Sequence, residues 1–352
     1  MSRTEDFVEH KGKGLTGLAN LGNTCFINSC MQVLSHTHEL NIFLDEKNGD
    51  YKNRLSAHHN QKYILDSKIL VEWDKLRTLM WEENRIISPG GFIKAIHSVA
   101  KQKGREIFTG YAQNDLPEFL LFIIDTFHNG MRREVDMKIK GDVINNTDKL
   151  AVSCFNVMKT MYSKEYSEIL DIFYGIHVSK IEANGAIMSV KPEPYFIIDL
   201  PIIINRLTCS IKDCFDNYCS SETLEGENGW YNEKTKEKQD VDKKIVFWSL
   251  PKIMVIDLKR FTYNGKKIQK PVDLELDNLD LSNYVEGYNK ESYKYELFGV
   301  CNHSGGTLGG HYTATIKVGP TDWYLFNDTQ VSKIKFDGKN NTSGYCLFYR
   351  KK

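Results

Sequence analysis

The feature that most constrains the fold is a change in hydrophobic pattern near residue 174. Before it, from about residue 24, apolar residues recur every three to four positions, as in Phe119, Ile123 and Phe127, which is typical of amphipathic helices. After it, short runs rich in β-branched and aromatic residues, such as 295–300, indicate strands. Helices that precede strands, without regular alternation, predict an α+β fold.

Composition excludes several classes of protein. The 352 residues are 41% hydrophobic and 12% aromatic, which excludes a mainly disordered chain, and length alone suggests about two domains. The 46 basic and 46 acidic residues balance, so we expect no nucleic-acid partner and no membrane partner. The N-terminus lacks an apolar targeting segment, and polar residues interrupt the most apolar stretches, 195–204 and 245–258. We therefore expect an intracellular protein, in the cytoplasm with the nucleus as an alternative.

Two polar stretches are expected at the surface. Residues 222–244 are almost wholly polar, with Trp230 and Tyr231 as the largest apolar residues, and residues 137–149 are similar. Because neither stretch can bury enough apolar surface to order itself, we expect solvated loops or a hairpin tip.

The eight cysteines fit a reducing compartment, in which they remain thiols. No C-x-x-C pair occurs in the chain. Cys209, Cys214 and Cys219 lie five residues apart without a nearby histidine cluster, so the pattern favours structural thiols over metal ligands.

Cys25 is the first candidate for a catalytic residue. Gly22-Asn23-Thr24 combines a turn with an N-cap residue, and the periodic apolar residues begin at Phe26, so Cys25 falls in the first turn of a helix. The positive end of the helix dipole favours a thiolate, so we expect a lowered pKa and a nucleophilic sulfur. Taken alone, Cys25 would be interpreted as a small buried hydrophobic residue, and it needs a catalytic partner.

Such a partner lies near the other end of the chain. A glycine-rich stretch, 305–310, precedes His311 at the start of a strand, and the next strand ends at Asn327 and Asp328. If the two strands pair, His311 lies beside Asn327 and Asp328. A thiolate, an imidazole base and an amide or carboxylate that orients the imidazole form the Cys-His-Asn/Asp arrangement of papain-like proteases.

The whole pattern resembles the ubiquitin-specific proteases, a papain-like family of deubiquitinating enzymes. Residues 14–34 resemble the Cys box of that family, and residues 309–318 with 323–334 resemble its His box. Three intermediate segments agree, namely 111–120 with QQDAQEFL, 193–196 with EPF, and 250–261 with LP…LKRF. The resemblance covers nearly the whole chain, from about residue 14 to residue 350.

The resemblance implies a role for each residue of the site. Cys25 is the nucleophile, His311 is the general base and then the acid, and Asn327 orients His311. Asp328 is a second candidate for the orienting role. Asn20 matches the side chain that stabilises the oxyanion, where the loss of a donor costs roughly 3 kcal/mol.

The resemblance also implies how ubiquitin, with its extended basic tail ending in Gly-Gly, is bound. Gln113, Asp115 and Glu118 match substrate contacts, and the two carboxylates match those that bind arginines of the tail. Phe261 and Tyr312 match aromatic residues that line the channel for the Gly-Gly end. Without the resemblance, Glu118 would be a solvated helical residue, and Phe261 and Tyr312 would be ordinary strand packing.

The fold implied by the resemblance is a right hand. The helical thumb corresponds to about 14–174, and the mixed palm with its β-rich fingers corresponds to about 175–352. We therefore expect a single α+β catalytic domain at 14–352, with the active site between thumb and palm, after an N-terminal tail at 1–13.

The chain departs from the family pattern at two points. Many members hold the fingertips with zinc bound by two C-x-x-C pairs, but the corresponding segments, near 177–182 and 230–234, contain no cysteine. We therefore expect no structural metal and no cofactor. Pro117 replaces a usual polar residue, which a helix tolerates in its first turn.

The expected reaction is acyl transfer through a thioester, with ubiquitin and ubiquitinated proteins as partners and the need for an activating partner unknown. Two alternatives stay open: a catalytically silent ubiquitin-binding module, and a protease for another ubiquitin-like modifier.

Overall fold

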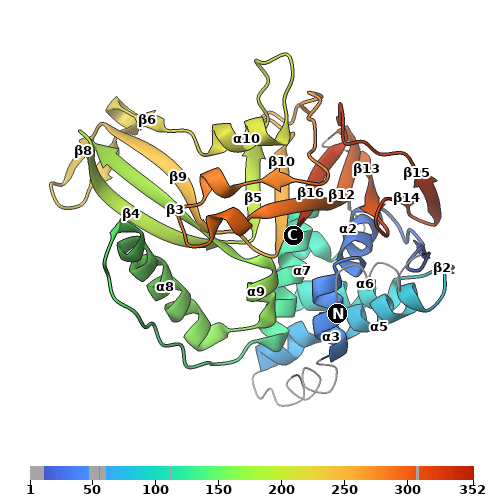
Figure 1. The fold of residues 1–352 in the computed structure, drawn as a ribbon. Helices are drawn as coiled ribbons and strands as arrows, with labels where there is room; N and C mark the ends of the chain where they lie inside the picture. The colour runs from blue at the N-terminus through green and yellow to red at the C-terminus, as the bar shows by residue number, and fades with distance from the viewer. Residues whose placement is uncertain (1–11, 47–54, 56–60, 111, 307–308) are drawn as a thin grey trace.

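A helical half and a large β-sheet lie side by side, and a smaller sheet extends away from them (Figure 1). This arrangement is that of a computed structural model, which describes residues 12–46, 55, 61–110, 112–306 and 309–352. The group of helices packed on one another corresponds to the expected thumb, the large sheet to the palm and the smaller sheet to the fingers. Helices give way to strands between α9 (Glu168–Phe173) and β3 (Gly175–Ala183), where the hydrophobic pattern changes.

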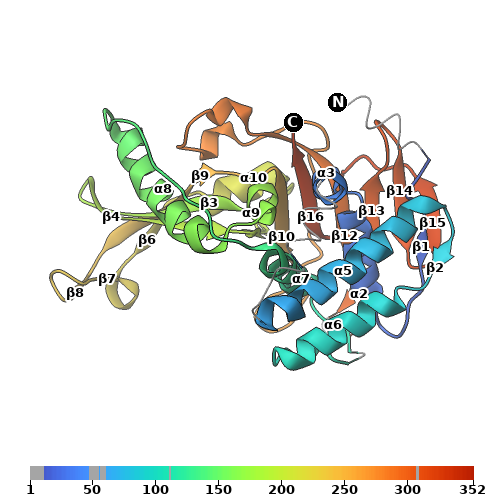
Figure 2. The same ribbon diagram turned by 90° about the horizontal axis from the view of Figure 1, so that it is seen from below.

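The thumb is a group of helices around α2, which is buried along its whole length. Its helices are α2 (Cys25–Ser35), α3 (His38–Glu46), α5 (Gln61–Glu82), α6 (Gly90–Gln102), α7 (Leu116–Met131) and α9, as Figure 2 shows from below. Short elements join them, namely β1 (Gly17–Leu18), β2 (Ile86–Ile87) and η1 (Glu106–Phe108). Pro117 lies in the first turn of α7, as expected.

The palm is a sheet with the strand order β15-β14-β13-β12-β16-β10-β5. Its strands are β5 (Ile197–Pro201), β10 (Ile253–Lys259), β12 (Lys294–Gly306), β13 (Gly309–Lys317), β14 (Trp323–Asn327), β15 (Gln330–Ile334) and β16 (Gly344–Lys351), and β11 (Leu279–Asp280) pairs with β12. The side chains of β10 alternate between two cores. Ile253 and Val255 join the thumb core, whereas Met254 and Ile256 join the core on the opposite face. Because both faces are covered, the strand is continuously apolar.

The core on the far face of the palm is closed by α10 (Ile211–Tyr218), which buries Ile211, Cys214 and Phe215. A capping box stabilises the start of this helix, because the Ser210 hydroxyl accepts from the Asp213 N–H while the Asp213 carboxylate accepts from the Ser210 N–H. The short helices η3 (Ser282–Tyr284) and η4 (Lys290–Ser292) complete this side of the molecule.

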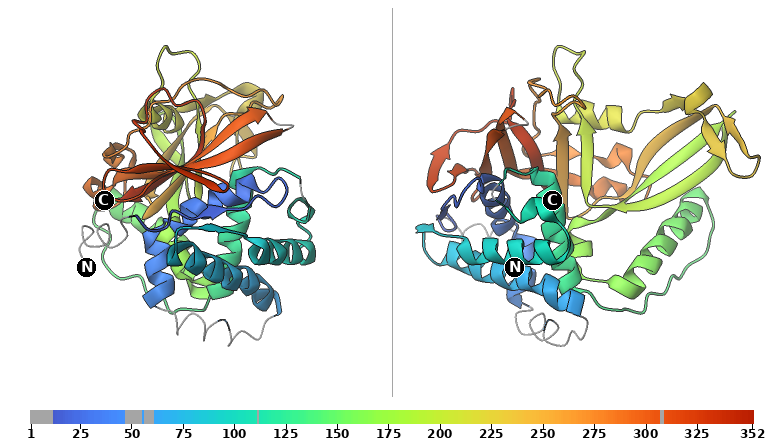
Figure 3. Two further views of the ribbon diagram at one scale, coloured as in Figure 1. Left: turned by 90° about the vertical axis from the view of Figure 1, so that its right-hand side faces the viewer. Right: turned by 180° about the vertical axis from the view of Figure 1, so that it is seen from behind.

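The fingers are a sheet with the strand order β4-β3-β9-β6, extended by a hairpin. The strands are β4 (Ala186–Tyr195), β3, β9 (Val241–Ser249) and β6 (Glu222–Leu224), with η2 (Gly226–Asn228) and the hairpin β7 (Trp230–Asn232) and β8 (Glu237–Gln239) beyond them. Helix α8 (Asn146–Glu165) lies along this sheet (Figure 3). Cys154 of α8 packs against Val178 and Trp248 of the sheet, so the base of the fingers has a small core of its own.

The polar stretches are more ordered than expected. In 222–244, the β7–β8 hairpin agrees with the prediction, but the solvated-loop prediction is wrong for 222–224 and 241–244, which pair as β6 and the start of β9. In 137–149, the loop prediction holds only up to Asn145, because a capping box starts α8 at Asn146. Among the described residues, no helix has the length and apolar character needed to cross a membrane.

Candidate active site

Cys25 is the first residue of α2, as expected, and only 1% of it is exposed. The turn before it is ordered by the side chain of Asn20, whose Oδ1 accepts from the backbone N–H groups of Gly22 and Thr24 at 3.1 Å each. Thr24 occupies the N-cap position, but its side chain makes no cap hydrogen bond; its hydroxyl instead accepts from the Leu21 N–H at 2.9 Å. The turn therefore directs Cys25 inward at the start of the helix.

The pKa of Cys25 is not lowered as the sequence predicted. Burial raises the pKa of the thiol, and the nearby Asp328 carboxylate raises it further, while hydrogen bonds from the backbone of Tyr312 and Phe26 act in the opposite direction. Desolvation therefore outweighs the helix N-terminus in the free protein. The Tyr312 contact also shows that the sulfur lies against β13, next in sequence to His311.

His311 and Asn327 come together from neighbouring strands, as predicted. β13 and β14 pair in antiparallel fashion, and His311 Nε2 lies 2.7 Å from Asn327 Oδ1. Because an amide oxygen can only accept a hydrogen bond, Nε2 carries the ring proton and Nδ1 is left as the basic nitrogen. The hydrogen bond thus fixes the tautomer that a general base requires.

Asp328 has a different set of partners from the one expected of a second orienter of His311. Its carboxylate accepts from Asn20 Nδ2 at 3.0 Å and from Asn28 Nδ2 at 2.7 Å. Asp328 therefore holds Asn20, and it is Asn327 that holds His311. Asn28, on α2 one turn after Cys25, was missed by the sequence analysis, and it also donates weakly to the carbonyls of Leu18 and Ala19.

A pocket of about 260 Å³ opens between the thumb and the palm beside the candidate catalytic residues. Its lining residues are Gln113, Asn114, Asp115, Phe261, His303, Gly306, Tyr312 and Tyr345. Four of the five residues expected to contact substrate thus line one cavity. The fifth, Glu118, is an exposed residue of the first turn of α7 and does not line it.

Gln113 bridges the two walls of this pocket. Its amide oxygen accepts from the Gly310 N–H at 2.7 Å, and its amide nitrogen donates to the Gly310 carbonyl. Gly310 leaves no room for a side chain, because an added Cβ would lie 2.3 Å from His303 Nε2. In this structure Gln113 therefore clasps the glycine-rich loop across the cleft.

His303 and Tyr345 were missed by the sequence analysis. The His303 ring packs against Tyr312, Phe261 and Tyr345, with centroid distances of 4.7, 5.5 and 5.9 Å. Burial lowers the pKa of His303 to about 4, so the ring is neutral at physiological pH. Knowledge of the strand register in the β12–β13 hairpin would have revealed His303, because His303 pairs directly with Tyr312.

Asp115 faces the same pocket and accepts a hydrogen bond from the Tyr345 hydroxyl at 2.8 Å. Burial raises the pKa of its carboxyl group, and the Tyr345 hydroxyl and the nearby Lys259 oppose that shift. Tyr345 therefore fixes the carboxylate at the mouth of the pocket.

The described residues contain no group of three or more His, Cys, Asp or Glu side chains arranged to hold a metal ion. Cys209 and Cys214 do meet, with their sulfurs 3.5 Å apart, whereas Cys219 is the C-cap residue at the other end of α10. All eight cysteines of the chain are buried free thiols.

Comparison with known proteins identifies the relatives of this chain. The family model described as ubiquitin carboxyl-terminal hydrolase matches residues 16–349. The chain is 31% identical over 347 residues to human ubiquitin carboxyl-terminal hydrolase 2, covering 96% of this chain and 55% of the relative. It is 30% identical over 353 residues to Usp2 of Drosophila melanogaster, covering 97% of this chain and 35% of the relative. The chain thus spans between a third and about half of the length of these relatives.

A solved structure titled as the SAGA Ubp8/Sgf11/Sus1/Sgf73 DUB module bound to ubiquitin aldehyde has the same fold. The TM-score is 0.70 at 23% identity, over 97% of this chain and 70% of that chain. The module bound to monoubiquitin gives a TM-score of 0.69 at 22% identity, with the same coverage. The predicted α+β fold of thumb, palm and fingers is therefore confirmed. With the family model spanning nearly all of it, the chain belongs to the ubiquitin carboxyl-terminal hydrolase family, as the resemblance to ubiquitin-specific proteases predicted.

Proposed function

We propose that the protein is a deubiquitinating cysteine protease, which hydrolyses the isopeptide or peptide bond after the C-terminal glycine of ubiquitin. We further propose that residues 14–352 form a single catalytic domain and that ubiquitin and ubiquitinated proteins are its partners. Family membership and the hydrogen bond of 2.7 Å between His311 and Asn327 support this proposal. This hydrogen bond is the main support for the proposal, because it orients an imidazole base on the strand that contacts the Cys25 sulfur.

In the proposed first step, the sulfur of Cys25 attacks the carbonyl carbon of the terminal glycine. His311 Nδ1 takes the thiol proton, and Asn327 stabilises the resulting imidazolium through its amide oxygen. Because burial raises the pKa of Cys25 in the free protein, we expect the thiol to give up its proton to His311 when substrate is bound.

The negative charge then develops on the carbonyl oxygen, and Asn20 is the proposed donor to it. Asp328 accepts one of the two N–H groups of the Asn20 amide, which leaves the other for the oxyanion. His311 next protonates the leaving amine, and water attacks the thioester to release the ubiquitin tail. No step of this sequence needs a cofactor.

Tail recognition is proposed for the pocket between thumb and palm. Gln113, Phe261 and Tyr312 line this pocket, and its uncharged aromatic walls suit a segment of chain without side chains. Asp115 supplies a carboxylate at the mouth, and Glu118 lies one turn further along α7, where it would meet a basic residue farther from the scissile bond. The clasp between Gln113 and Gly310 must open to admit the tail.

A ubiquitin probe with a thiol-reactive group at its C-terminus tests the proposal. The wild-type protein should form a covalent adduct, and Cys25→Ala should form none. Cys30→Ser is the matched control, because Cys30 is a buried thiol on the same helix and should not be required. A wild-type protein that binds ubiquitin without an adduct would instead be the catalytically silent module.

Probes made from other ubiquitin-like modifiers test the remaining alternative. Faster reaction with one of them than with ubiquitin would change the proposed substrate but keep the reaction. We also propose an intracellular location, in the cytoplasm or the nucleus, which the eight free thiols support. Fractionation of cells that express the full-length protein would test the location.

A further inference from the structure

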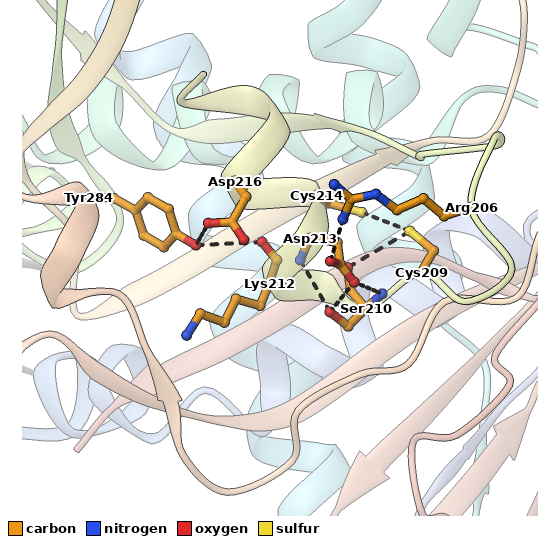
Figure 4. Close-up of polar contacts among 8 residues, drawn as sticks. All are labelled: Arg206, Cys209, Ser210, Lys212, Asp213, Cys214, Asp216 and Tyr284. Atoms are coloured by element: carbon orange, nitrogen blue, oxygen red, sulfur yellow. Dashed lines mark hydrogen bonds and ion pairs between the residues drawn. The ribbon is translucent and has the colours of Figure 1, made fainter. Parts of the chain in front are cut away.

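Two buried thiols face each other beside α10, far in sequence from the catalytic cysteine (Figure 4). The sulfurs of Cys209 and Cys214 are 3.5 Å apart, and the residues are 2% and 0% exposed. A disulfide needs a sulfur–sulfur distance of about 2.05 Å, so a small rotation of the two side chains is enough to join them. No residue proposed for catalysis takes part in this contact.

The capping box of α10 holds the pair in register. Ser210 separates Cys209 from the helix, and Asp213 directly precedes Cys214. The hydrogen bonds between Ser210 and Asp213 turn the chain tightly into the helix, and this turn brings the residues five positions apart face to face. The juxtaposition is therefore fixed by local structure and not by chance packing.

A surface loop, residues 202–208, lies against the pair. The Ile203 N–H donates to the Cys214 sulfur, and Leu207 is fully exposed, at 101%. The loop is tied down by the ion pair between Arg206 and Asp213, at 2.8 Å, and by Lys270, which donates to the Arg206 and Leu207 carbonyls. Because these bonds lie at the surface, oxidation of the pair would require only that the loop opens briefly for a small oxidant to reach the sulfurs.

A buried cation lies near the two sulfurs. The Arg260 side chain is 0% exposed, and its guanidinium donates to four backbone carbonyls, those of Ile268, Lys270, Asn341 and Gly344. Burial raises the pKa of Cys214, and both sulfurs act on Arg260 electrostatically. A positive charge therefore lies within electrostatic range of the site, and the reactive form of a cysteine is the thiolate.

We propose that Cys209 and Cys214 form an oxidisable dithiol site, which a peroxide converts into an intramolecular disulfide. One thiolate attacks the peroxide O–O bond, becomes a sulfenic acid and releases one water. The second thiol then attacks that sulfur, the S–S bond forms and a second water leaves. In total two thiols and one hydrogen peroxide give one disulfide and two waters, so the thiols are oxidised and the peroxide is reduced.

A second pair of buried cysteines shows whether burial alone, without the direct contact between sulfurs, leads to a disulfide. Cys301 and Cys346 are opposite each other on β12 and β16, and both are fully buried. Their thiols influence each other electrostatically, but among the described residues no hydrogen bond joins their sulfurs as one joins those of Cys209 and Cys214. The proposal therefore expects a disulfide at Cys209–Cys214 and none at Cys301–Cys346.

Peptide mapping of the full-length Cys25→Ala protein tests the proposal, since Cys25 itself would react with peroxide. After treatment with hydrogen peroxide and blocking of free thiols, trypsin should release peptide 207–212 linked to peptide 213–234. Dithiothreitol should separate them. Recovery of Cys209 and Cys214 as blocked free thiols, under conditions that oxidise Cys25 in the wild type, would overturn the proposal.

Cys219 provides the matched control, because it lies in the same tryptic peptide as Cys214 and is more exposed, at 7%. Cys219→Ser should keep the linked peptides, and Cys214→Ser should lose them. If Cys219→Ser loses the linked peptides and Cys214→Ser keeps them, the disulfide involves Cys219 at the other end of α10, and the proposed pairing is wrong. The wild-type protein, mapped alongside, needs no substitution and keeps the test valid if a serine variant misfolds.

A second measurement checks that the disulfide restrains the loop. Arg206 is an exposed trypsin site in the folded protein, three residues before Cys209. Native cleavage after Arg206 should slow several-fold in the oxidised protein and recover on reduction. Equal cleavage rates in both states would contradict a restraint on residues 202–208.

Discussion

Asn20 and Asp328 form a pair in which one residue is proposed to act through the other. Asp328 has a left-handed backbone conformation, with φ of 50°, which turns its carboxylate toward Asn20 and Asn28. Asn20 also accepts from the turn before Cys25, so its amide is oriented from both ends. This arrangement fixes the remaining N–H in one direction, which is what a preorganised oxyanion donor requires.

We predict that Asn20→Ala lowers kcat by about 100-fold, the cost of one oxyanion donor. Asp328→Ala should lower kcat by a similar factor, because the released amide no longer points at the oxyanion. The double variant should be no worse than the worse single variant. Steady-state hydrolysis of a fluorogenic ubiquitin amide measures these values, and additive losses would mean that the two residues act separately.

Asp257 gives a prediction about pH. Burial on β10 raises its pKa from 3.8 to about 6, although Lys259 donates to it at 2.8 Å. A carboxyl group with a raised pKa stabilises the fold below about pH 4, and this contribution is lost as the pH rises toward 6. Asp257→Asn should therefore gain stability relative to wild type between pH 4 and pH 7, by roughly 1–3 kcal/mol.

Urea unfolding of both proteins across that pH range measures the effect. The difference between variant and wild type isolates Asp257, because the other groups are common to both. If the stability difference between variant and wild type stays constant with pH, the pKa of Asp257 is not raised in the folded protein.

At the residue scale, the sequence predicted Cys25, His311 and Asn327 because each belongs to a local motif with its own chemistry. It did not predict the partners of Asp328, since these depend on which way a single side chain leaves a turn. The raised pKa of Cys25 was missed for a related reason: desolvation depends on everything packed around the sulfur, whereas the helix N-terminus is visible in the sequence.

Among the elements, β10 and the loops after it depend on one buried arginine. Arg260 follows β10 directly, and its guanidinium joins residues 268–270 to residues 341–344 through their carbonyls. A buried arginine with carbonyl partners is a structural residue, and it determines where the adjacent Phe261 lies in the pocket.

We predict that Arg260→Met costs at least about 3 kcal/mol of unfolding free energy, because it leaves buried carbonyls without donors. Arg260→Lys should also be strongly destabilising, since an ammonium group cannot reach acceptors in both segments. Thermal and urea unfolding measure the loss. Arg206→Met is the control, because its ion pair is largely exposed and should cost less than about 1 kcal/mol; equal losses would refute the structural role.

The strands were predicted best where an apolar run in the sequence is also buried by packing in the structure. The apolar run at 295–300 became part of β12, where most of its side chains are buried. The errors fell on polar stretches. Residues 241–244 look solvated in the sequence, but they continue β9 because β3 offers backbone partners along its length.

On the scale of the whole molecule, the site joins segments from opposite ends of the chain. The Leu18 N–H donates to the Asp328 carbonyl at 2.9 Å. Gly17 approaches so closely that an added Cβ would lie 2.4 Å from the Thr329 carbonyl oxygen. At the other side of the thumb, Arg350 donates to Glu39 at 2.8 Å and to the His36 carbonyl at 3.0 Å. These contacts fix the helical half against the palm.

We predict that Gly17→Ala lowers kcat by at least about 10-fold, because it separates the segment that carries Asn20 from the turn that carries Asp328. The relative loss in the free energy of unfolding should be smaller than the relative loss in kcat, since Gly17 lies at the edge of the thumb. Gly110→Ala is the control, because open space surrounds that position. Wild-type kcat in Gly17→Ala would show that the close approach has no part in catalysis.

The separation of Cys25 from His311 has a consequence for how the protein is made. During translation α2 leaves the ribosome early, and β13 and β14 emerge only after the strands of the fingers and the palm strands β5, β10, β11 and β12. A chain that ends before β13 therefore carries the proposed nucleophile, Cys25, without His311, Asn327 or the Asp328 carboxylate that accepts from Asn20. Under the proposed function, a chain whose synthesis stops before β14 would be unable to remove ubiquitin from itself or from its neighbours.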